Sequence, residues 1–323
     1  MRVLVTGGAG YIGSVVAAQL VAAGHEVTVL DDLSTGYADA VPAGAGFVKG
    51  TLRDCAAEVL ADDIEAVLHF AAKSLVGESV AEPARYWSAN LGGAIALLEA
   101  MREIGVRTIV FSSTAAVYGE PERTPITETD RTRPTSPYGA SKLAADTTLT
   151  EFAQLYGFGA VSLRYFNVAG AHRADSGAWF GERHHPETHL IPNVLASAAA
   201  GGRVQVFGDD YPTPDGTCVR DYIHVTDLAD AHLRALGACR PGQHRVYNLG
   251  HGTGFSVRQV IDVCAEVTGM ELEVDVTARR PGDPAVLIAS AERIASELGW
   301  RADRDLRAIA ADAWEFTQAR INR

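Results

Sequence analysis

The sequence predicts an α/β protein with a Rossmann-type, doubly wound parallel sheet and a smaller C-terminal α/β substrate-binding domain. A short apolar segment at residues 2–6 leads directly into a glycine-rich turn and then into a helical pattern. Further apolar segments alternate with helical patterns through the first half of the chain. Because parallel strands need crossover connections, usually helices, this alternation favours a parallel sheet with helices on both faces.

The first half of the chain divides into expected strands and helices. The expected strands cover residues 2–6, 26–30, 67–70, 108–112 and 160–164. The expected helices cover residues 11–23, 83–104 and 137–156. The first of these helices stops at Gly24, since glycine readily adopts the backbone conformation that ends a helix.

The second half of the chain is less regular after about Asn167. Residues 171–187 are rich in glycine, histidine and charge, which predicts a loop, and helices are expected near 226–236 and 306–320. We therefore expect a first domain over residues 1–166 and a second over residues 167–323, partly interleaved with the first.

Charge and cysteine usage exclude several classes of partner. A formal net charge of −12 over 323 residues argues against nucleic acid or an anionic membrane, because repulsion opposes both. No apolar run reaches the roughly 18 residues of a membrane span, and no signal peptide precedes residues 2–6. The four cysteines form no CxxC pair, which argues against disulfides and a zinc site. Together these features predict a cytoplasmic protein.

The glycine-rich turn carries glycines at positions 7, 10 and 13, and also fits the GxGxxG spacing through Gly8. It follows a strand and opens a helix, which is the context in which a dinucleotide pyrophosphate binds backbone N–H groups. Asp31 lies about 20 residues on, at the end of the second expected strand. A carboxylate there accepts hydrogen bonds from ribose hydroxyls and repels a 2′-phosphate, so the sequence favours NAD over NADP.

Tyr138 and Lys142 are spaced i and i+4 in an expected helix, so both project from one face. An ammonium beside a phenol lowers the phenol pKa, which would make the pair a general base for a sugar hydroxyl. The chain has three lysines, so a lysine at this position is informative. Thr114 lies at the carboxyl end of the strand expected at 108–112, at the sheet edge where ligands bind, and its hydroxyl can contact the same substrate oxygen.

These residues belong to a wider set of motifs. The whole chain resembles the extended short-chain dehydrogenase/reductases, and among them the UDP-glucose 4-epimerases. The matching segments are Gly7 to Gly13, Val76-Gly77-Glu78-Ser79, Val117-Tyr118-Gly119, Ser136 to Lys142, Arg164-Tyr165-Phe166-Asn167, Arg220-Asp221-Tyr222, Tyr247-Asn248-Leu249-Gly250 and Arg280-Pro281-Gly282-Asp283. The stretch from Asp210 to Thr217, followed by Val219 to Tyr222, is the most specific of these to the epimerases.

The resemblance implies reversible C4 epimerisation of a UDP-hexose through a transient 4-keto sugar, with NAD bound throughout. It implies a first domain that binds NAD and a second that binds the UDP-sugar. The implied catalytic residues are Tyr138, Lys142 and Thr114. The implied cofactor-binding residues are Gly7, Gly10, Tyr11, Ile12, Gly13, Asp31, Leu52, Phe70, Ala71, Lys73, Asn90, Tyr138, Lys142 and Tyr165. The implied substrate-binding residues are Thr114, Tyr138, Asn167, His189, Leu190, Gln205, Phe207, Arg220, Arg280, Asp283 and Leu287.

Several positions depart from the family pattern, the mildest being Thr114, where the family has a serine. Thr51 stands where many relatives have an aspartate that contacts adenine. The lysine expected to reach the cofactor phosphates aligns with Ser74, and Lys73 lies one residue earlier. Leu287 aligns with the position that limits sugar size, and leucine is intermediate between a bulky tyrosine and a small residue.

Other functions within and outside the family make different demands on these residues. A 4,6-dehydratase needs proton-transfer groups beside the hydroxyl residue, where this chain has Ala115 and Ala116. A 4-epimerase of UDP-N-acetylglucosamine or UDP-glucuronate is an open alternative. A non-catalytic NAD sensor has no need of Tyr138 and Lys142.

Two further expectations concern metal and assembly. The stretch His184-His185-Pro186-Glu187-Thr188-His189 has the composition of a metal-binding box, but Pro186 disfavours a helix that presents His185 and His189 together, so no metal is expected. Relatives form dimers through the helix that carries the Tyr–Lys pair and the helix before it. Ile95, Leu98 and Leu143 would suit such a homodimer, although core packing explains them equally well.

Overall fold

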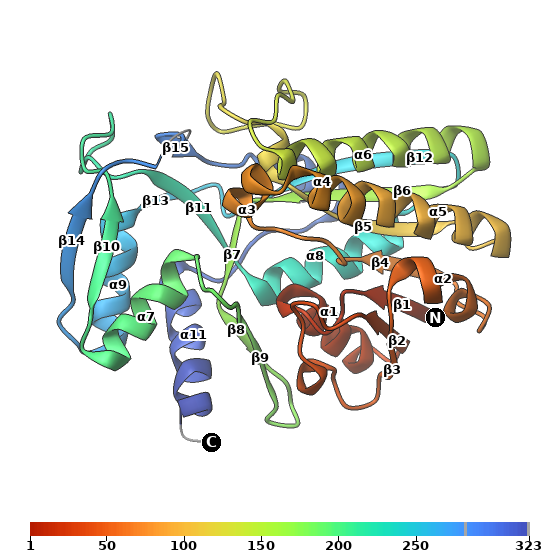
Figure 1. Cartoon of the computed structure of the whole chain (residues 1–323), viewed down its shortest axis with the longest axis horizontal. Coiled ribbons are helices and arrows are strands. Elements are labelled where there is room, and N and C mark those ends of the chain that lie inside the picture. Colours follow the sequence, from red (N-terminus) through yellow and green to blue (C-terminus); the bar gives the residue numbers. More distant parts are fainter. Residues whose placement is uncertain (281–282, 322–323) are drawn as a thin grey trace.

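A seven-stranded parallel sheet forms the centre of the described chain, with strand order β12-β6-β5-β4-β1-β2-β3 (Figure 1). The computed structural model describes residues 1–280 and 283–321, so Pro281 and Gly282 of the last sequence motif lie outside the described residues. The strands are β1 (Arg2–Thr6), β2 (Glu26–Asp31), β3 (Gly46–Lys49), β4 (Ala66–His69), β5 (Thr108–Thr114), β6 (Gly159–Tyr165) and β12 (Gln243–Leu249). The order reverses beside β1, which pairs with β2 on one side and β4 on the other, and this switch point is where α/β sheets bind ligands.

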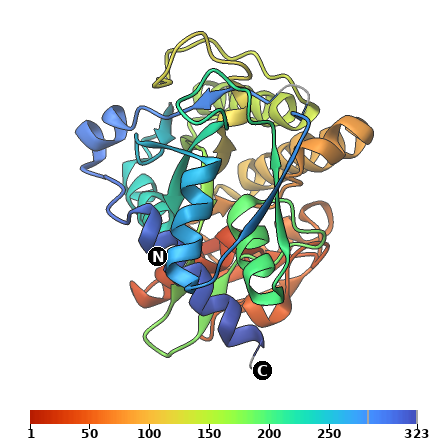
Figure 2. The ribbon, with the colours of Figure 1, turned by 90° about the vertical axis from the view of Figure 1, so that its left-hand side faces the viewer.

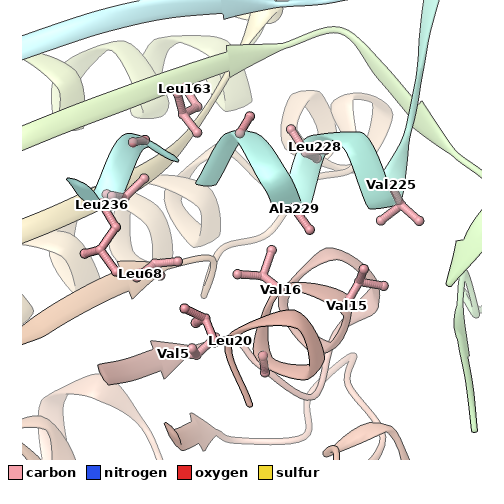
Figure 3. Close-up of a cluster of buried hydrophobic side chains, with 14 of the residues drawn as sticks. Val5, Val15, Val16, Leu20, Leu68, Leu163, Val225, Leu228, Ala229 and Leu236 are labelled. Carbon is pink, nitrogen blue, oxygen red and sulfur yellow. The ribbon is translucent and has the colours of Figure 1, made fainter. Parts of the chain in front are cut away.

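Alternation along β1 sends side chains to two cores. Val3 and Val5 face a cluster shared with α1 (Tyr11–Ala22) and α8 (Val225–Ala238). Figure 3 shows α1 and α8 meeting there through Val16 and Ala229. Leu4 faces the opposite cluster. That second core is formed with α2 (Leu52–Leu60), α5 (Gly93–Ile104) and α6 (Pro137–Tyr156). The expected fold class is confirmed, with both faces of the sheet covered.

The C-terminal part adds small sheets and a helical layer. The strands are β7 (Asn167–Ala169), β10 (Arg203–Phe207), β11 (Val219–His224), β13 (Gly254–Ser256), β14 (Glu273–Thr277) and β15 (Val286–Leu287). The helices are α7 (Leu190–Ala200), α9 (Val257–Thr268), α10 (Glu292–Leu298) and α11 (Leu306–Ile321). Figure 2 views this part from the side, where α9 and α11 pack together.

The chain returns to the large sheet after it has entered the second half. β12 pairs in parallel with β6, and α8 packs on the same sheet, although both follow residue 167. The domain boundary at residue 166 therefore stays a prediction. Any division of the chain into domains has to account for the return of β12 and α8 to the large sheet.

Two local expectations are wrong. The helix expected at 83–104 is interrupted: α4 (Pro83–Tyr86) and α5 flank a π-helical turn at Trp87–Gly92. The loop expected at 171–187 contains an antiparallel hairpin of β8 (Ala171–Arg173) and β9 (Trp179–Gly181). Gly177 permits the hairpin turn because its φ is +82°. Phe180 is buried in the α1 and α8 core, which provides the hairpin with apolar packing.

The remaining short elements are α3 (Val76–Ala81) and the 3₁₀ turns at Ala38–Ala40 and Ala115–Val117. None of the helices in residues 1–280 and 283–321 has the length and hydropathy that a bilayer span requires.

Candidate active site

A cavity of about 880 Å³ lies at the carboxyl ends of the central strands. Many residues that the sequence assigned to the site line it together. They are Gly7, Gly10, Tyr11, Ile12, Gly13, Asp31, Leu52, Phe70, Ala71, Lys73, Thr114, Tyr138, Lys142, Tyr165, Asn167, His189, Asp283 and Leu287. The topology therefore brings residues from both halves of the chain to one place.

The glycine-rich turn forms one end of this cavity. Gly7 has φ +72°, and a Cβ there would lie 2.5 Å from the backbone nitrogen of Ala71, so only glycine fits. A Cβ on Gly13 would lie 2.3 Å from the Gly7 carbonyl oxygen, so this glycine lets α1 approach the turn closely. α1 begins after Gly10 without a side-chain cap, which leaves its first N–H groups facing the cavity. A pyrophosphate fits such a cradle.

Asp31 is buried at the end of β2, where the backbone holds its carboxylate in place. One oxygen accepts from Ala9 N at 3.0 Å and the other from Leu33 N at 2.8 Å. Burial raises the pKa of Asp31, while these hydrogen bonds act against that rise. The carboxylate is thus oriented toward the cavity, where a ribose would lie.

Thr51 lines the same region but is already engaged. Its hydroxyl caps α2 by accepting from Asp54 N at 3.3 Å and donates to the Asp54 carboxylate at 2.7 Å. Threonine here therefore serves the helix N-terminus.

The Asn90 side chain hydrogen-bonds to the backbone of Lys73 and does not face the cavity. Its side chain accepts from Lys73 N at 2.8 Å and donates to Lys73 O at 3.0 Å and to the Ser141 hydroxyl at 3.1 Å. Asn90 is buried in the π-helical turn and is absent from the cavity lining among the described residues. The structure therefore assigns Asn90 a positioning role, with Lys73 presented to the cavity.

The Tyr–Lys pair is set by the start of α6. The Ser136 hydroxyl caps this helix by accepting from Gly139 N at 3.2 Å, and Pro137 occupies the first turn. Tyr138 and Lys142 then both reach the cavity, as does Thr114 from the end of β5. Thr114 accepts from Ala116 N at 3.1 Å, which fixes its hydroxyl.

The electrostatics of the pair differ from the sequence expectation. Lys142 donates from Nζ to the Ser112 carbonyl at 2.8 Å, and burial lowers its pKa to about 8, against an opposing effect of Asp146. Burial raises the pKa of Tyr138, and the Thr114 hydroxyl lowers it. The expectation that Lys142 lowers the phenol pKa is therefore wrong for the chain alone, because burial outweighs hydrogen bonding and the ammonium is directed to a carbonyl.

The predicted nucleotide-anchoring residues fall into two groups. Asn167, His189, Asp283 and Leu287 line the cavity. Leu190, Gln205, Phe207, Arg220 and Arg280 do not line it within the described part of the chain.

The second group has partners of its own. Arg220 is buried, forms an ion pair with Asp283 and donates to its own strand at Val219 O. The Arg280 guanidinium lies over the Phe207 ring, 3.9 Å from its centroid. Gln205 is exposed on β10, and Leu190 is partly buried at the start of α7.

Five charged residues of the cavity were not assigned to the site from the sequence: Asp32, Arg53, Arg85, Glu182 and His184. Arg53 and Arg85 add positive charge, and no motif pointed to them. Glu182 and His184 lie next to His189. For His184, the composition of the 184–189 stretch was the available signal, but the expected lack of a helix there argued against a site. Glu182 precedes that stretch, and no motif pointed to it.

Several motif residues are structural. Asp146 on the Tyr–Lys helix α6 and Arg164 on β6 form a buried ion pair at 3.0 Å. Asp221 accepts from the backbone nitrogens of His251, Gly252 and Ala289 at 2.8–3.0 Å. These groups hold the loops around the site without lining it.

A glycine cradle at a helix N-terminus, an oriented carboxylate at the end of β2 and a Tyr–Lys pair define a nicotinamide-dependent enzyme of the short-chain dehydrogenase type. The chain belongs to the NAD dependent epimerase/dehydratase family, whose sequence profile matches residues 3–250.

Comparison with known proteins gives similarity over nearly the whole length. A UDP-glucose 4-epimerase of Streptomyces lividans is 56% identical, covering 98% of this chain and 95% of that protein. A UDP-glucose 4-epimerase of Corynebacterium glutamicum is 54% identical, covering 99% and 96%. A crystal structure of the Stenotrophomonas maltophila UDP-glucose 4-epimerase, with bound NAD and formylated UDP-arabinopyranose, superposes with a TM-score of 0.94 at 40% identity, covering 100% of this chain and 99% of that one.

Proposed function

We propose that this protein catalyses the reversible C4 epimerisation of a UDP-hexose, interconverting UDP-glucose and UDP-galactose with NAD held in the cavity. The observation that carries the proposal is the convergence of Tyr138, Lys142 and Thr114 on the cavity that the glycine cradle enters. The two named relatives at 54% and 56% identity support this reaction.

The side chains divide the chemistry between them. Tyr138 accepts the proton of the sugar 4-hydroxyl, and Thr114 hydrogen-bonds the same oxygen. Bound NAD supplies the acceptor for the C4 hydride and, in its oxidised form, a positive charge near the phenol. The product of this half-reaction is a ketone at C4. Return of the hydride to the opposite face, with the proton coming back from Tyr138, gives the epimer with no net oxidation.

The cavity favours epimerisation over water elimination. Ala115 and Ala116 follow Thr114 and line the cavity, and neither side chain can transfer a proton. A dehydratase needs such a group to expel the C6 hydroxyl.

Inversion at C4 requires the hexose to turn while the nucleotide stays bound. We assign that anchoring to Asn167 and His189 on the cavity wall. Arg220, which pairs with the cavity residue Asp283, and Arg280, which lies over the Phe207 ring, complete the assignment. Binding energy from a remote UDP group can hold the reactant without restraining the sugar ring.

The test is to supply purified protein with UDP-glucose, UDP-galactose, their N-acetyl forms and UDP-glucuronate, and to identify the products. Tyr138→Phe should lower turnover at least about 100-fold with NAD still bound. Tyr156→Phe is the matched control, since Tyr156 lies exposed at the far end of the same helix. Equal activity of the two variants would remove Tyr138 from the mechanism.

We also propose that two copies pair through α5 and α6. Ile95 is 40% exposed and Leu155 is 71% exposed on these helices, which leaves apolar surface for a partner. Leu98 is 1% exposed in the core, so it is not available to a partner. Sedimentation should give a dimer, and Leu155→Arg should shift it toward monomer.

We place the reaction in the cytoplasm. Cys55, Cys218, Cys239 and Cys264 are all free in the structure, as is usual in a reducing compartment. Recovery of activity in the soluble cytoplasmic fraction of cells would test this assignment.

A further inference from the structure

The segment between β9 and α7 folds so that four potential metal ligands meet. Glu182 directly follows β9, and His189 directly precedes α7. Together with His184 and Glu187, they place one ligand atom each within 4.8 Å of one another. Pro186 does prevent a helix here, but the irregular chain brings the side chains together without one.

The distances show two imidazoles directed at the same carboxylates. Glu182 Oε1 lies 3.0 Å from His184 Nδ1 and 2.7 Å from His189 Nδ1. Glu187 lies 2.9 Å from His189 Nδ1 through one oxygen and 3.7 Å from His184 Nδ1 through the other. Around a tetrahedral zinc ion, neighbouring ligand atoms lie roughly 3.3–3.6 Å apart. Small side-chain rotations therefore suffice to accommodate an ion.

Burial distinguishes Glu182 from an ordinary surface carboxylate, while His189 at the other end of the cluster is 46% exposed. The Glu182 side chain is 6% exposed, and among the described residues it receives no arginine, lysine or backbone N–H. Its partners there are the two histidines. His184 Nδ1 is itself buried without a hydrogen bond of good geometry. Buried carboxylates need paired charge, and a divalent cation supplies it.

We propose that Glu182, His184, Glu187 and His189 form a binding site for one divalent transition metal ion of the zinc class. Two imidazole nitrogens and two carboxylate oxygens give the four donors of a tetrahedral zinc site, whereas magnesium and calcium favour an all-oxygen set. Glu182, His184 and His189 also line the large cavity, so the bound ion fixes the wall beside the nucleotide.

Protons compete with a metal ion for the histidine nitrogens of this cluster. Burial alone would lower the pKa of each histidine, but Glu182 and Glu187 raise the pKa of His184 to about 9 and that of His189 to about 10. An all-protein cluster of two protonated histidines and two carboxylates is therefore the rival state, and the experiment has to separate the two.

The test measures metal content and needs no activity assay, so it is independent of the proposed reaction. The purified full-length protein, with its cofactor, is treated with EDTA, equilibrated with zinc chloride and desalted. We expect about one zinc ion per chain by elemental mass spectrometry. Cobalt(II) loading should give the intense visible bands of a tetrahedral site, and a chromophoric chelator then gives the zinc affinity.

Three variants decide the assignment. Glu182→Gln keeps the size of the side chain, and His184→Ala removes a ligand; each should weaken zinc binding more than about 10-fold. His185→Ala is the matched control, since His185 is exposed and outside the cluster. Circular dichroism establishes that each variant is folded. Less than a tenth of a zinc ion per wild-type chain, or equal affinity of His184→Ala and His185→Ala, would overturn the proposal.

Discussion

Replacing Lys142 by methionine should stabilise the nucleotide-free protein while it removes activity. Lys142 is 2% exposed, and burial lowers its pKa from 10.5 to about 8. At about 1.4 kcal/mol for each pKa unit, keeping this lysine charged at pH 7 costs roughly 3 kcal/mol. Methionine avoids that cost but loses the hydrogen bond to the Ser112 carbonyl, which offsets about 1 kcal/mol.

The free energy of unfolding of Lys142→Met should therefore exceed that of the wild type by about 2 kcal/mol. For a chain of this length, this corresponds to a rise in melting temperature of roughly 3 °C. The stability difference between the variant and the wild type depends on pH. Because the folded pKa lies below the unfolded value, the unfolded state binds more protons between about pH 8 and 10.4, and wild-type stability rises with pH over that window. The advantage of the variant should be complete below pH 8 and largely lost near pH 10.

The assay is calorimetric unfolding of nucleotide-free protein at several pH values. Lys49→Met is the control, since Lys49 is exposed and no burial cost is removed there. A lower melting temperature for Lys142→Met at pH 7, or a difference that does not change between pH 8 and 10, would refute the reasoning.

Three further substitutions test separate parts of the site. Gly7→Ala should destabilise the protein by at least about 2 kcal/mol in denaturant unfolding, because φ is positive and Ala71 blocks the Cβ; Gly77→Ala, with open space around it, should cost nothing. Asn90→Ala should weaken NAD binding about 10-fold by calorimetry, because the Lys73 backbone loses its clamp; unchanged affinity would contradict the positioning role. Leu287→Tyr should reduce turnover of N-acetylated UDP-sugars first by narrowing the cavity, and an equal fall for plain hexoses would show that Leu287 is not the gate.

Local patterns were enough to predict the elements that start the fold. β1, α1 and β2 lie within one residue of their expected bounds, and α6 matches its expected bounds fully. Their signals are contained in neighbouring residues: apolar periodicity, a glycine turn, and Pro137 at a helix start. The placement of Tyr138 and Lys142 on one helix face follows from the same short-range geometry.

Contacts between distant residues decided the rest. Asn90 lies in the π-helical turn, and its side chain hydrogen-bonds to Lys73 and Ser141, which are 17 and 51 positions away. β12 enters the central sheet by pairing with a strand more than eighty residues earlier.

The sequence by itself determined the cofactor loop and the Tyr–Lys pair, because each depends on residues within a few positions of one another. It also indicated a parallel sheet, through the alternation of strand and helix patterns along the chain. Tertiary structure alone decided that Lys142 points to Ser112 and that Arg220 pairs with Asp283. It also decided that Glu182 meets His184 and His189. The partner of a charged group depends on how deeply the group is buried and on which other groups the fold places within a few ångströms of it. Neither the burial nor these neighbours can be read from a sequence pattern.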